Sequence, residues 1–514
     1  MSANNSKIAH NTFFLYGRMV FVLFISIYTT RVILNSLGII DYGVYNVVCG
    51  FVSMFSFFNT TMSSCIQRFY NFEKGKGERG NLTVVFQTSI IIQVALAIII
   101  FIFLELFGLW FVNNELTIPE DRLYAANWIF QFATISLILI ILQIPYSSAV
   151  IAYERMDFYA FVSMFDAILK LLIVISLPLI SGDKLISYGI LLVLVSILNF
   201  IFYYVYSRNK FKNLRFRFFW DKKLFSSILS YTGWTLLEMF AWMTQNQGIN
   251  IVMNIFFGPV VNAARAISLQ IQNAIQAFCV NLVTAFRPQL IESYVQTNYH
   301  RTKTMMYSMS KIMFVFFFMI STPIIIEVNY ILNLWLGDSV PEFTSSFIIL
   351  MLVSMFPRNF VMAFSQIIEA SGIVKQYRIW SSILILLVLP SSYLILRCGG
   401  TPPSVYYLNL AVCTVLFVTC AFLLKKVFVF SMLDYGKKII IPCIIVALIT
   451  IIILKFECSL IQEGLLRFIM VCVSSLICTC FLSYFIIFKS QEKAMMTSMI
   501  YKIFLKLGFR NNSK

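Results

Sequence analysis

Four arginines lie inside long apolar stretches of the sequence, where a charged side chain is energetically unfavourable. Arg18 and Arg31 lie in the first stretch, and Arg265 and Arg358 lie in later ones. A charge at the centre of a membrane-spanning helix costs roughly 2.5–3.5 kcal/mol unless it faces a partner or a wet cavity. These arginines therefore predict a cationic cavity that binds an anion. For Arg18, a side chain that snorkels to the membrane surface is an equally good interpretation.

Amide and hydroxyl side chains extend this polar character along two neighbouring segments. Arg265 begins a stripe at helical spacing, which continues with Ser268, Gln272 and Gln276. The preceding segment contributes Gln245 and Asn250. A helix face with so many polar groups does not face lipid, so we expect these side chains to line the cavity. Hydrogen bonding between helices is the alternative role.

Two carboxylates are candidates for coupling transport to an ion. Glu238 lies near the middle of the seventh apolar segment, and no basic residue within its own helix can pair with it. Asp166 has Lys170 one turn further along, a spacing at which the two charges neutralise each other. Glu238 is therefore the better candidate for binding a proton or a cation. For Asp166 a structural ion pair is the favoured interpretation, and ion coupling is the alternative.

The sequence predicts no metal site, no cofactor and no catalytic group. Its only histidines, His10 and His300, lie outside the apolar segments. Its eleven cysteines lie mostly inside apolar segments, without the spacing of metal ligands, and are interpreted as small core residues. We therefore expect the protein not to be an enzyme.

The composition places the chain in a lipid bilayer. Of its 514 residues 60% are apolar and 12% charged, and the mean hydropathy is +0.85. About 20 apolar residues are needed to cross a bilayer as a helix. Segments of that length predict fourteen spans, among them 12–35 and 43–65, separated by a turn at 39–43, and later 225–255 and 261–286. The predicted fold class is an all-α polytopic membrane protein.

The distribution of basic residues predicts the orientation of these spans. The net charge is +17, and Lys and Arg gather in alternate loops, most densely at 208–223. Because cytoplasmic loops carry the excess of Lys and Arg, both termini are expected in the cytoplasm. The loops on the other side are short, roughly 5–15 residues, so no extracytoplasmic domain is expected. No solvated basic domain exists that would bind nucleic acid.

The first two spans recur in the second half of the chain. Gly38 corresponds to Gly258 at an offset of 220 residues, and Arg68 corresponds to Arg287 at an offset of 219. A repeat of this length indicates two homologous halves, which membrane transporters often have. The predicted organisation is a six-helix lobe at 1–210, a pseudo-symmetric six-helix lobe at 211–424, two further spans at 425–489 and a basic amphipathic cytoplasmic tail at 490–514.

Short motifs at corresponding places in the two halves are similar to those of a known family. The first half contains Leu15-Tyr16-Gly17-Arg18, Thr30-Arg31-Val32, Asp41-Tyr42-Gly43-Val44-Tyr45 and Gln67-Arg68-Phe69. The second half contains Asn262-Ala263-Ala264-Arg265 and Phe286-Arg287-Pro288-Gln289. The chain resembles the bacterial polysaccharide-biosynthesis flippases, the O-antigen and capsule repeat-unit translocases of the multidrug/oligosaccharidyl-lipid/polysaccharide (MOP) exporter superfamily.

This resemblance implies a function and a location. Such proteins move an undecaprenyl-pyrophosphate-linked oligosaccharide across the bacterial cytoplasmic (inner) membrane by alternating access, for lipopolysaccharide and other surface polysaccharides. The implied partners are the lipid-linked oligosaccharide, membrane lipids, a polysaccharide polymerase and glycosyltransferases. Arg18 and Arg31 match the family's first span and Arg265 its eighth, whereas Arg358 is chosen from its depth alone.

Three other functions remain open. A multidrug or cation antiporter of the same fold would favour carboxylates over arginines in its cavity. A flippase for the peptidoglycan lipid precursor, of the same superfamily, would be distinguished by whether loss of the gene is lethal. A membrane polymerase or glycosyltransferase would be expected to have a sizeable outside loop or a soluble acidic domain, and the sequence has neither.

Overall fold

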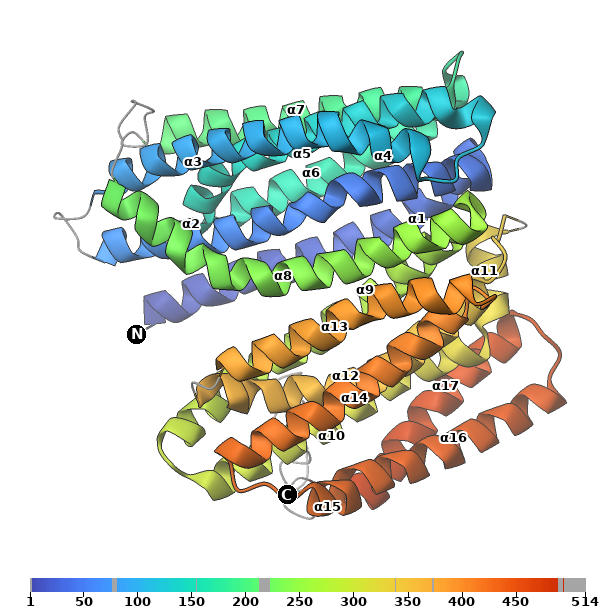
Figure 1. The fold of residues 1–514 in the computed structure, drawn as a ribbon. Coiled ribbons are helices and arrows are strands. Elements are labelled where there is room, and N and C mark those ends of the chain that lie inside the picture. The colour runs from blue at the N-terminus through green and yellow to red at the C-terminus, as the bar shows by residue number, and fades with distance from the viewer. Residues whose placement is uncertain are drawn as a thin grey trace, which may run out of the picture. The chain divides into compact units, whose positions relative to one another are not determined.

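The fold is known from a computed structural model that describes residues 2–75, 81–153, 155–211, 222–337, 339–371, 374–488 and 493. Within helices, some side chains lie outside this description, and the longest such stretch is 222–238. The described chain is helical, with short turns between the helices and no strand (Figure 1). The predicted basic tail at 490–514 lies outside the described residues, apart from Lys493.

The chain forms two compact units, each described by itself. The first unit comprises 1–270, 336–344 and 382–405, and the second comprises 271–335, 345–381 and 406–514. This division groups residues by contact and differs from the predicted sequence halves, which stay a prediction. Several long helices contribute residues to both units; they are α9 (Pro259–Val295), α12 (Thr344–Ala370), α13 (Val374–Arg397) and α14 (Ser404–Val427).

In the first unit, long helices run lengthwise beside one another (Figure 1). They are α1 (Ser2–Ser53), α2 (Phe57–Gly75), α3 (Leu82–Phe103), α4 (Leu109–Asn114), α5 (Leu123–Ala152), α6 (Met156–Ser176), α7 (Lys184–Lys210) and α8 (Lys222–Phe257). Short helical turns link some of them, at Met54–Ser56 (η1), Leu104–Gly108 (η3), Glu120–Arg122 (η4) and Leu177–Leu179 (η5).

The predicted turn between the first two spans is wrong in detail. Helix continues through 39–43, and the break is a kink at the single residue Gly38, with φ 82° and ψ 171°. Only glycine adopts a positive φ without steric cost, so one residue is enough to redirect the chain. The sequence pattern suggested a loop because Asp41, Tyr42 and Gly43 are poor helix formers.

The second unit contains the remaining helices. They are α10 (Tyr299–Ile326), α11 (Val328–Leu336, whose last residue belongs to the first unit), α15 (Met432–Tyr435), α16 (Ile441–Leu460) and α17 (Leu465–Leu482), with π-helical turns at Gly436–Ile440 (η6) and Ser483–Ile487 (η7). Tyr435 anchors α15 in this unit, because its ring packs against Phe364 at 4.9 Å between centroids and its hydroxyl lies 2.9 Å from the Ser310 hydroxyl.

The predicted all-α polytopic fold class is confirmed. Among the described residues, eleven helical segments are long and apolar enough to cross a membrane. One of them, Gly17–Gln67, includes the predicted span 43–65 and all of the predicted span 12–35 except its first five residues. The predicted seventh and eighth spans lie in α8 and α9.

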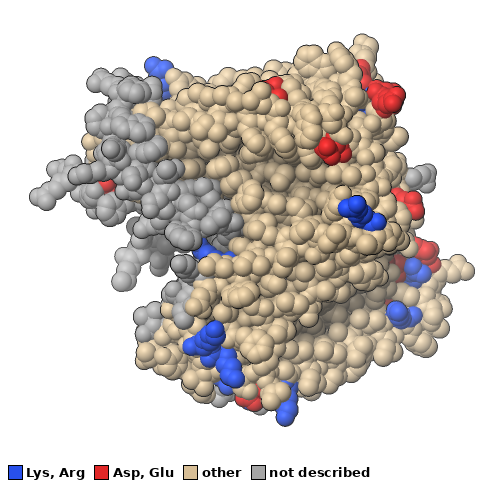
Figure 2. Space-filling model, in the orientation of Figure 1, with Lys and Arg blue, Asp and Glu red and all other residues tan. Residues whose placement is uncertain are grey.

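The surface carries many large apolar side chains, as expected for a protein that faces lipid. Phe24, Leu106 and Leu179 are 69%, 75% and 87% exposed, which water would penalise and lipid does not. On the face drawn in Figure 2, charged side chains stand singly or in small groups on a largely uncharged surface. Exposure of these apolar side chains therefore supports membrane embedding.

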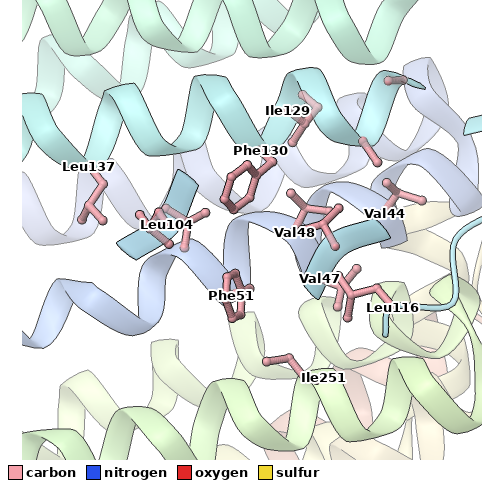
Figure 3. Close-up of a cluster of buried hydrophobic side chains, with 14 of the residues drawn as sticks. Val44, Val47, Val48, Phe51, Leu104, Leu116, Ile129, Phe130, Leu137 and Ile251 are labelled. Carbon is pink, nitrogen blue, oxygen red and sulfur yellow. The ribbon is translucent and has the colours of Figure 1, made fainter. Parts of the chain in front are cut away.

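The interior of the first unit is held together by tight packing. Phe51, Leu104 and Phe130 meet between α1, the turn after α3, and α5, and Ile251 of α8 joins them (Figure 3). Phe51 is 6% exposed, and Leu104 and Phe130 are fully buried. Lipid tails are as apolar as these side chains, so close contact rather than exclusion from water supplies the stability. This cluster positions the helices that carry the polar groups described below.

A charged clamp holds three of these helices at one end of the first unit. Arg122 donates two hydrogen bonds of 2.6 Å to the carboxylate of Asp41 and a third of 2.7 Å to Asp183. Asp183 also accepts from the backbone N–H groups of Leu185 and Ile186, as the N-cap of α7. Burial acts to raise the pKa of Asp183, but the hydrogen bonds from Arg122 and the backbone outweigh it and lower that pKa.

We expect Arg122→Ala to reduce stability by about 2 kcal/mol at neutral pH, because the charge-assisted hydrogen bonds to Asp41 and Asp183 vanish and the two carboxylates lose their shared cation. Thermal unfolding of the purified protein measures this. The part of this stabilisation that comes from Asp183 is fully present above the ordinary aspartate pKa of ~3.9. It is lost as the pH falls through the lowered pKa that Asp183 has in the folded protein. Lys184→Ala changes the exposed neighbouring cation and should leave stability unchanged. Equal unfolding of both variants would show that the clamp contributes nothing.

Candidate functional site

Arg18 lies against α6 in the first unit. Its Nη1 donates a 3.3 Å hydrogen bond to the Ser163 hydroxyl, and its guanidinium carbon lies 4.8 Å from the centre of the Tyr159 ring. Its Nε is buried and has no hydrogen-bond partner in the described part of the chain. Arg18 is therefore held by a hydroxyl and an aromatic face, with no carboxylate among these contacts. A guanidinium in this state retains donor capacity for an anion.

One face of α6 carries four polar side chains. Tyr159, Ser163, Asp166 and Lys170 follow one another at spacings of four, three and four residues, which places them in a line along the helix. Sequence reasoning singled out Asp166 and Lys170 but missed that they share a face with the partners of Arg18. The helical spacing in the sequence was the signal that could have revealed it.

Asp166 and Lys170 form an ion pair. Lys170 Nζ lies 2.7 Å from one carboxylate oxygen of Asp166, and the Asn199 amide of α7 donates to the other oxygen at 2.7 Å. Both oxygens of the carboxylate are therefore engaged. The structural pairing has the geometry expected from the sequence, whereas ion coupling at Asp166 stays a prediction.

Arg265 is buried at the junction of α8 and α9. It is 2% exposed, and its Nη2 donates a 2.7 Å hydrogen bond to the backbone carbonyl of Asn246. Ser268, one turn further, is 1% exposed and lies within hydrogen-bond distance of the carbonyls of Ala264 and Thr344. In this conformation both residues are enclosed by protein.

Asparagine side chains link the same helix junction to the rest of the first unit. Asn262 donates to the carbonyl and the side chain of Asn250 at 2.7 and 2.8 Å, and Asn254 donates to Asn262 at 2.9 Å. Asn250 donates to the Asn46 carbonyl of α1 at 3.1 Å. The Asn254 side chain also accepts a hydrogen bond from the Thr117 backbone N–H and donates one to the Thr117 carbonyl. Sequence reasoning found only Asn250 as a site residue, because amide partners on other helices leave no local pattern.

The remaining predicted site residues are spread over both units. Gln245 is 8% exposed on α8, and Arg31 is exposed on α1. Arg358, Gln272 and Gln276 belong to the second unit, where the Gln276 amide approaches the Met362 sulfur at 3.6 Å and Arg358 is half-buried. The side chain of Glu238 lies outside the described residues. A single cavity that unites these residues stays a prediction.

A cavity of about 250 Å³ lies wholly within the first unit. Its walls come from α1, α2, α5, α6 and α7 and the turn after α1. Its polar lining consists of Ser53, Ser56, Asn59, Ser136, Lys170 and Ser196, and aromatic walls are formed by Tyr45 and Phe132. Sequence reasoning did not find it, since single serines in apolar segments carry no distinctive spacing. Among the side chains that the structure describes, no group of His, Cys, Asp or Glu could hold a metal ion.

A buried ion pair in the second unit also escaped prediction. Glu327, at the end of α10, accepts two hydrogen bonds of 2.7 and 2.8 Å from Arg467 of α17. The Glu327 side chain is 0% exposed and that of Arg467 is 16% exposed. The two residues lie near the ends of two different predicted spans, 306–330 and 465–488, so nothing in the sequence indicated that they meet.

Solved structures of other proteins have a fold similar to that of this chain. No protein-family model and no curated protein sequence matches the chain. The lipid II flippase MurJ in an inward closed conformation is similar, with a TM-score of 0.71 and 14% identity over 93% of this chain and 98% of that chain. An inward-facing multidrug-resistance MATE transporter of the MOP superfamily has a TM-score of 0.61 and 13% identity, over 80% and 94% of the two chains. The eukaryotic MATE transporter AtDTX14 has a TM-score of 0.55 and 13% identity, over 82% and 97%. The chain therefore has the fold of these flippase and transporter structures.

Proposed function

We propose that the protein is a flippase for an undecaprenyl-pyrophosphate-linked oligosaccharide, the repeat unit of a surface polysaccharide such as O-antigen, capsule or lipopolysaccharide. It acts by alternating access in the bacterial cytoplasmic membrane, with both termini in the cytoplasm. The observation that carries the proposal is the set of arginines in a bilayer-spanning chain with the fold of a lipid-substrate flippase. Arg18 is the most informative of them, because its buried Nε has no partner among the described residues.

The physical requirement of this substrate supports the proposal. Moving a pyrophosphate and several sugars through hydrocarbon strips them of water, which costs many kcal/mol without compensating contacts. Arginine meets this need because its planar donors match phosphate oxygens and it remains charged. In the proposal, Arg18, Arg31, Arg265 and Arg358 hold the diphosphate during different stages of the cycle. Arg265, buried in this conformation, becomes accessible when α8 and α9 move.

The other proposed roles follow from the polar residues of the spans. Gln245, Asn250, Ser268, Gln272 and Gln276 line the sugar path, and Glu238 or Asp166 couples the cycle to an ion. The two sequence halves, 1–210 and 211–424, act as the moving lobes, while 425–489 contributes two further spans and 490–514 binds the inner membrane surface. A polysaccharide polymerase and glycosyltransferases are the proposed neighbours in the same biosynthetic route.

Two alternatives share the fold. A peptidoglycan-precursor flippase is favoured by the likeness to the lipid II flippase MurJ. A multidrug or cation antiporter is favoured by the likeness to MATE transporters. Arg18, whose described contacts are a serine hydroxyl and a tyrosine ring, argues for an anionic substrate over a cationic drug.

We expect Arg18→Ala to slow flipping at least tenfold, because one charge-assisted hydrogen bond to phosphate is worth about 1.5–3 kcal/mol. The measurement uses proteoliposomes that contain a pyrophosphate-linked oligosaccharide lipid. A glycosidase that cannot cross the bilayer reports how fast the sugars change leaflet. Loss of movement in Arg265→Ala, with an unchanged melting temperature, would add that residue to the path.

Arg208→Ala is the matched control for Arg18→Ala. Arg208 also contacts a tyrosine, donating to the Tyr204 hydroxyl at 3.0 Å, but it is exposed at the end of α7. Its variant should flip within twofold of the wild type. If the wild type does not move the lipid but expels a cationic drug against an ion gradient, the antiporter replaces the flippase.

A further inference from the structure

The cavity inside the first unit has the size of a small ligand. Its volume is about 250 Å³, just below the ~300–1,000 Å³ typical of sites for drug-sized molecules. It is therefore too small for an oligosaccharide and suits one ring. Lys170 lines it and has a side chain that is 45% exposed, so the cavity reaches the surface of the unit there.

The polar groups of this cavity are electrically neutral and have bonding capacity to spare. Asp166 cancels the charge of Lys170, whose Nζ lies 2.7 Å from the carboxylate. This contact occupies one of the three N–H donors of the Lys170 ammonium group. Ser53 and Ser196 donate their hydrogens to the carbonyls of Gly50 and Leu192, at 2.8 and 3.0 Å. Their oxygens therefore remain as acceptors. A neutral site with both donors and acceptors fits hydroxyl groups better than it fits an ion.

An orphaned acceptor points to a ligand. The side-chain oxygen of Asn59, a lining residue, is buried and has no hydrogen-bond partner in the described part of the chain. Leaving such a group without a partner costs about 1–3 kcal/mol, and a donor on a bound ligand removes that cost. Tyr45 and Phe132 add apolar walls of the kind that pack against the carbon face of a ring.

The cavity also stands in a definite relation to Arg18. Ser163, which binds Arg18, and Lys170, which lines the cavity, lie on the same face of α6, seven residues apart. At 1.5 Å per residue this separation is ~10 Å along the helix. A glycan attached to a pyrophosphate at Arg18 would extend along this face toward the cavity. This step of the argument rests on the proposed function, whereas the lining chemistry does not.

We infer that this cavity is a subsite for a single sugar ring, formed by Ser53, Asn59, Ser136, Lys170 and Ser196. The Asn59 oxygen and the serine oxygens accept hydrogen bonds from sugar hydroxyls, and the two remaining N–H groups of Lys170 donate to them. The subsite binds the sugar, while the arginines bind the pyrophosphate. It thus makes the first unit selective for the glycan of the lipid.

Saturation-transfer NMR on the purified full-length protein tests the subsite without any transport. The probes are free glucose, galactose and N-acetylglucosamine, each at millimolar concentration. We expect transfer from the wild type to at least one sugar and at least a fivefold smaller signal for Ser136→Leu, which fills the cavity. Asn59→Leu, nearly the same size as the original side chain, should reduce the signal as well. Thermal unfolding verifies that the variants are folded.

Ser147→Leu is the matched control, because Ser147 is on the same helix and nearly the same face as Ser136 but does not line the cavity. It should keep the wild-type signal. No transfer to any of the three sugars, or equal transfer in Ser136→Leu and Ser147→Leu, overturns the subsite. Lipid flipping is read separately: a wild type that binds sugar but moves no lipid keeps the subsite and removes the proposed function. If the wild type moves the lipid but Ser136→Leu leaves the sugar signals unchanged, the proposed function stands and the subsite is removed.

Discussion

Arg467→Ala is expected to lower the free energy of unfolding by about 3–5 kcal/mol, because it leaves the carboxylate of Glu327 buried without its cation. The Glu327 side chain is 0% exposed, and both its oxygens bond to Arg467, at 2.7 and 2.8 Å. The Cys458 thiol also lies close to this carboxylate, 3.5 Å from Oε1. Denaturation of the purified protein in detergent, followed by tryptophan fluorescence, measures the loss.

The neighbouring acid supplies the control. Glu463 also lies near Arg467, at 4.0 Å, but its side chain is 53% exposed. Glu463→Ala should change stability by less than about 0.5 kcal/mol, as exposed pairs usually do. The double variant Glu327→Gln with Arg467→Gln removes both charges and should recover most of the loss. If Arg467→Ala were as stable as Glu463→Ala, the pair would not hold α17 to α10.

Gly43→Ala is expected to destabilise the first unit by about 3 kcal/mol or more, since it forces two backbones apart. A Cβ atom at Gly43 would lie 1.9 Å from the carbonyl oxygen of Pro259 and 2.5 Å from its carbon. Backbone atoms cannot move aside as a flexible side chain can, and overpacking ordinarily costs 1–3 kcal/mol even with side-chain relaxation. The yield of folded protein in membranes and its melting temperature both report the effect.

Gly17→Ala on the same helix distinguishes this clash from a general effect of replacing glycine. Among the described residues, and leaving aside the adjoining residues and backbone of α1 itself, no atom lies within 4 Å of a Cβ at Gly17. Alanine there should be neutral or stabilising by up to ~1 kcal/mol, because it favours helix more than glycine does. A Gly43→Ala protein as stable as Gly17→Ala would mean that α1 and the start of α9 do not approach as closely as described.

The close approach at Gly43 depends on how α8 and α9 are joined. Gly258 has a φ of +74°, ends α8, and donates its N–H to the Asn254 carbonyl at 2.8 Å. Pro259 then begins α9, where its missing N–H costs nothing. Glycine after one helix and proline at the start of the next form a tight reversal. Gly258 and Pro259 lie between the predicted spans 225–255 and 261–286, but nothing in the sequence indicated the contact of Pro259 with Gly43.

The sequence was sufficient for features that depend on neighbouring residues. Hydropathy over about 20 residues identified the spans, and helical spacing identified the Asp166 and Lys170 pair. These succeed because the bilayer requires every span to satisfy its own backbone, so each span carries its own signal. The sequence placed the turn after the first span at 39–43, whereas the chain bends at Gly38. One glycine can redirect a helix without interrupting it.

The tertiary structure alone decided which polar side chains meet. Helical periodicity shows that Ser163 and Lys170 share a face of α6, but not that Arg18 or a cavity lies opposite. Glu327 and Arg467 are 140 residues apart, and no local pattern connects them. In a membrane each buried polar group must find a partner, yet that partner is set by the packing of whole helices. The amino-acid sequence thus determined the medium and the elements of this protein, and the packing determined its sites.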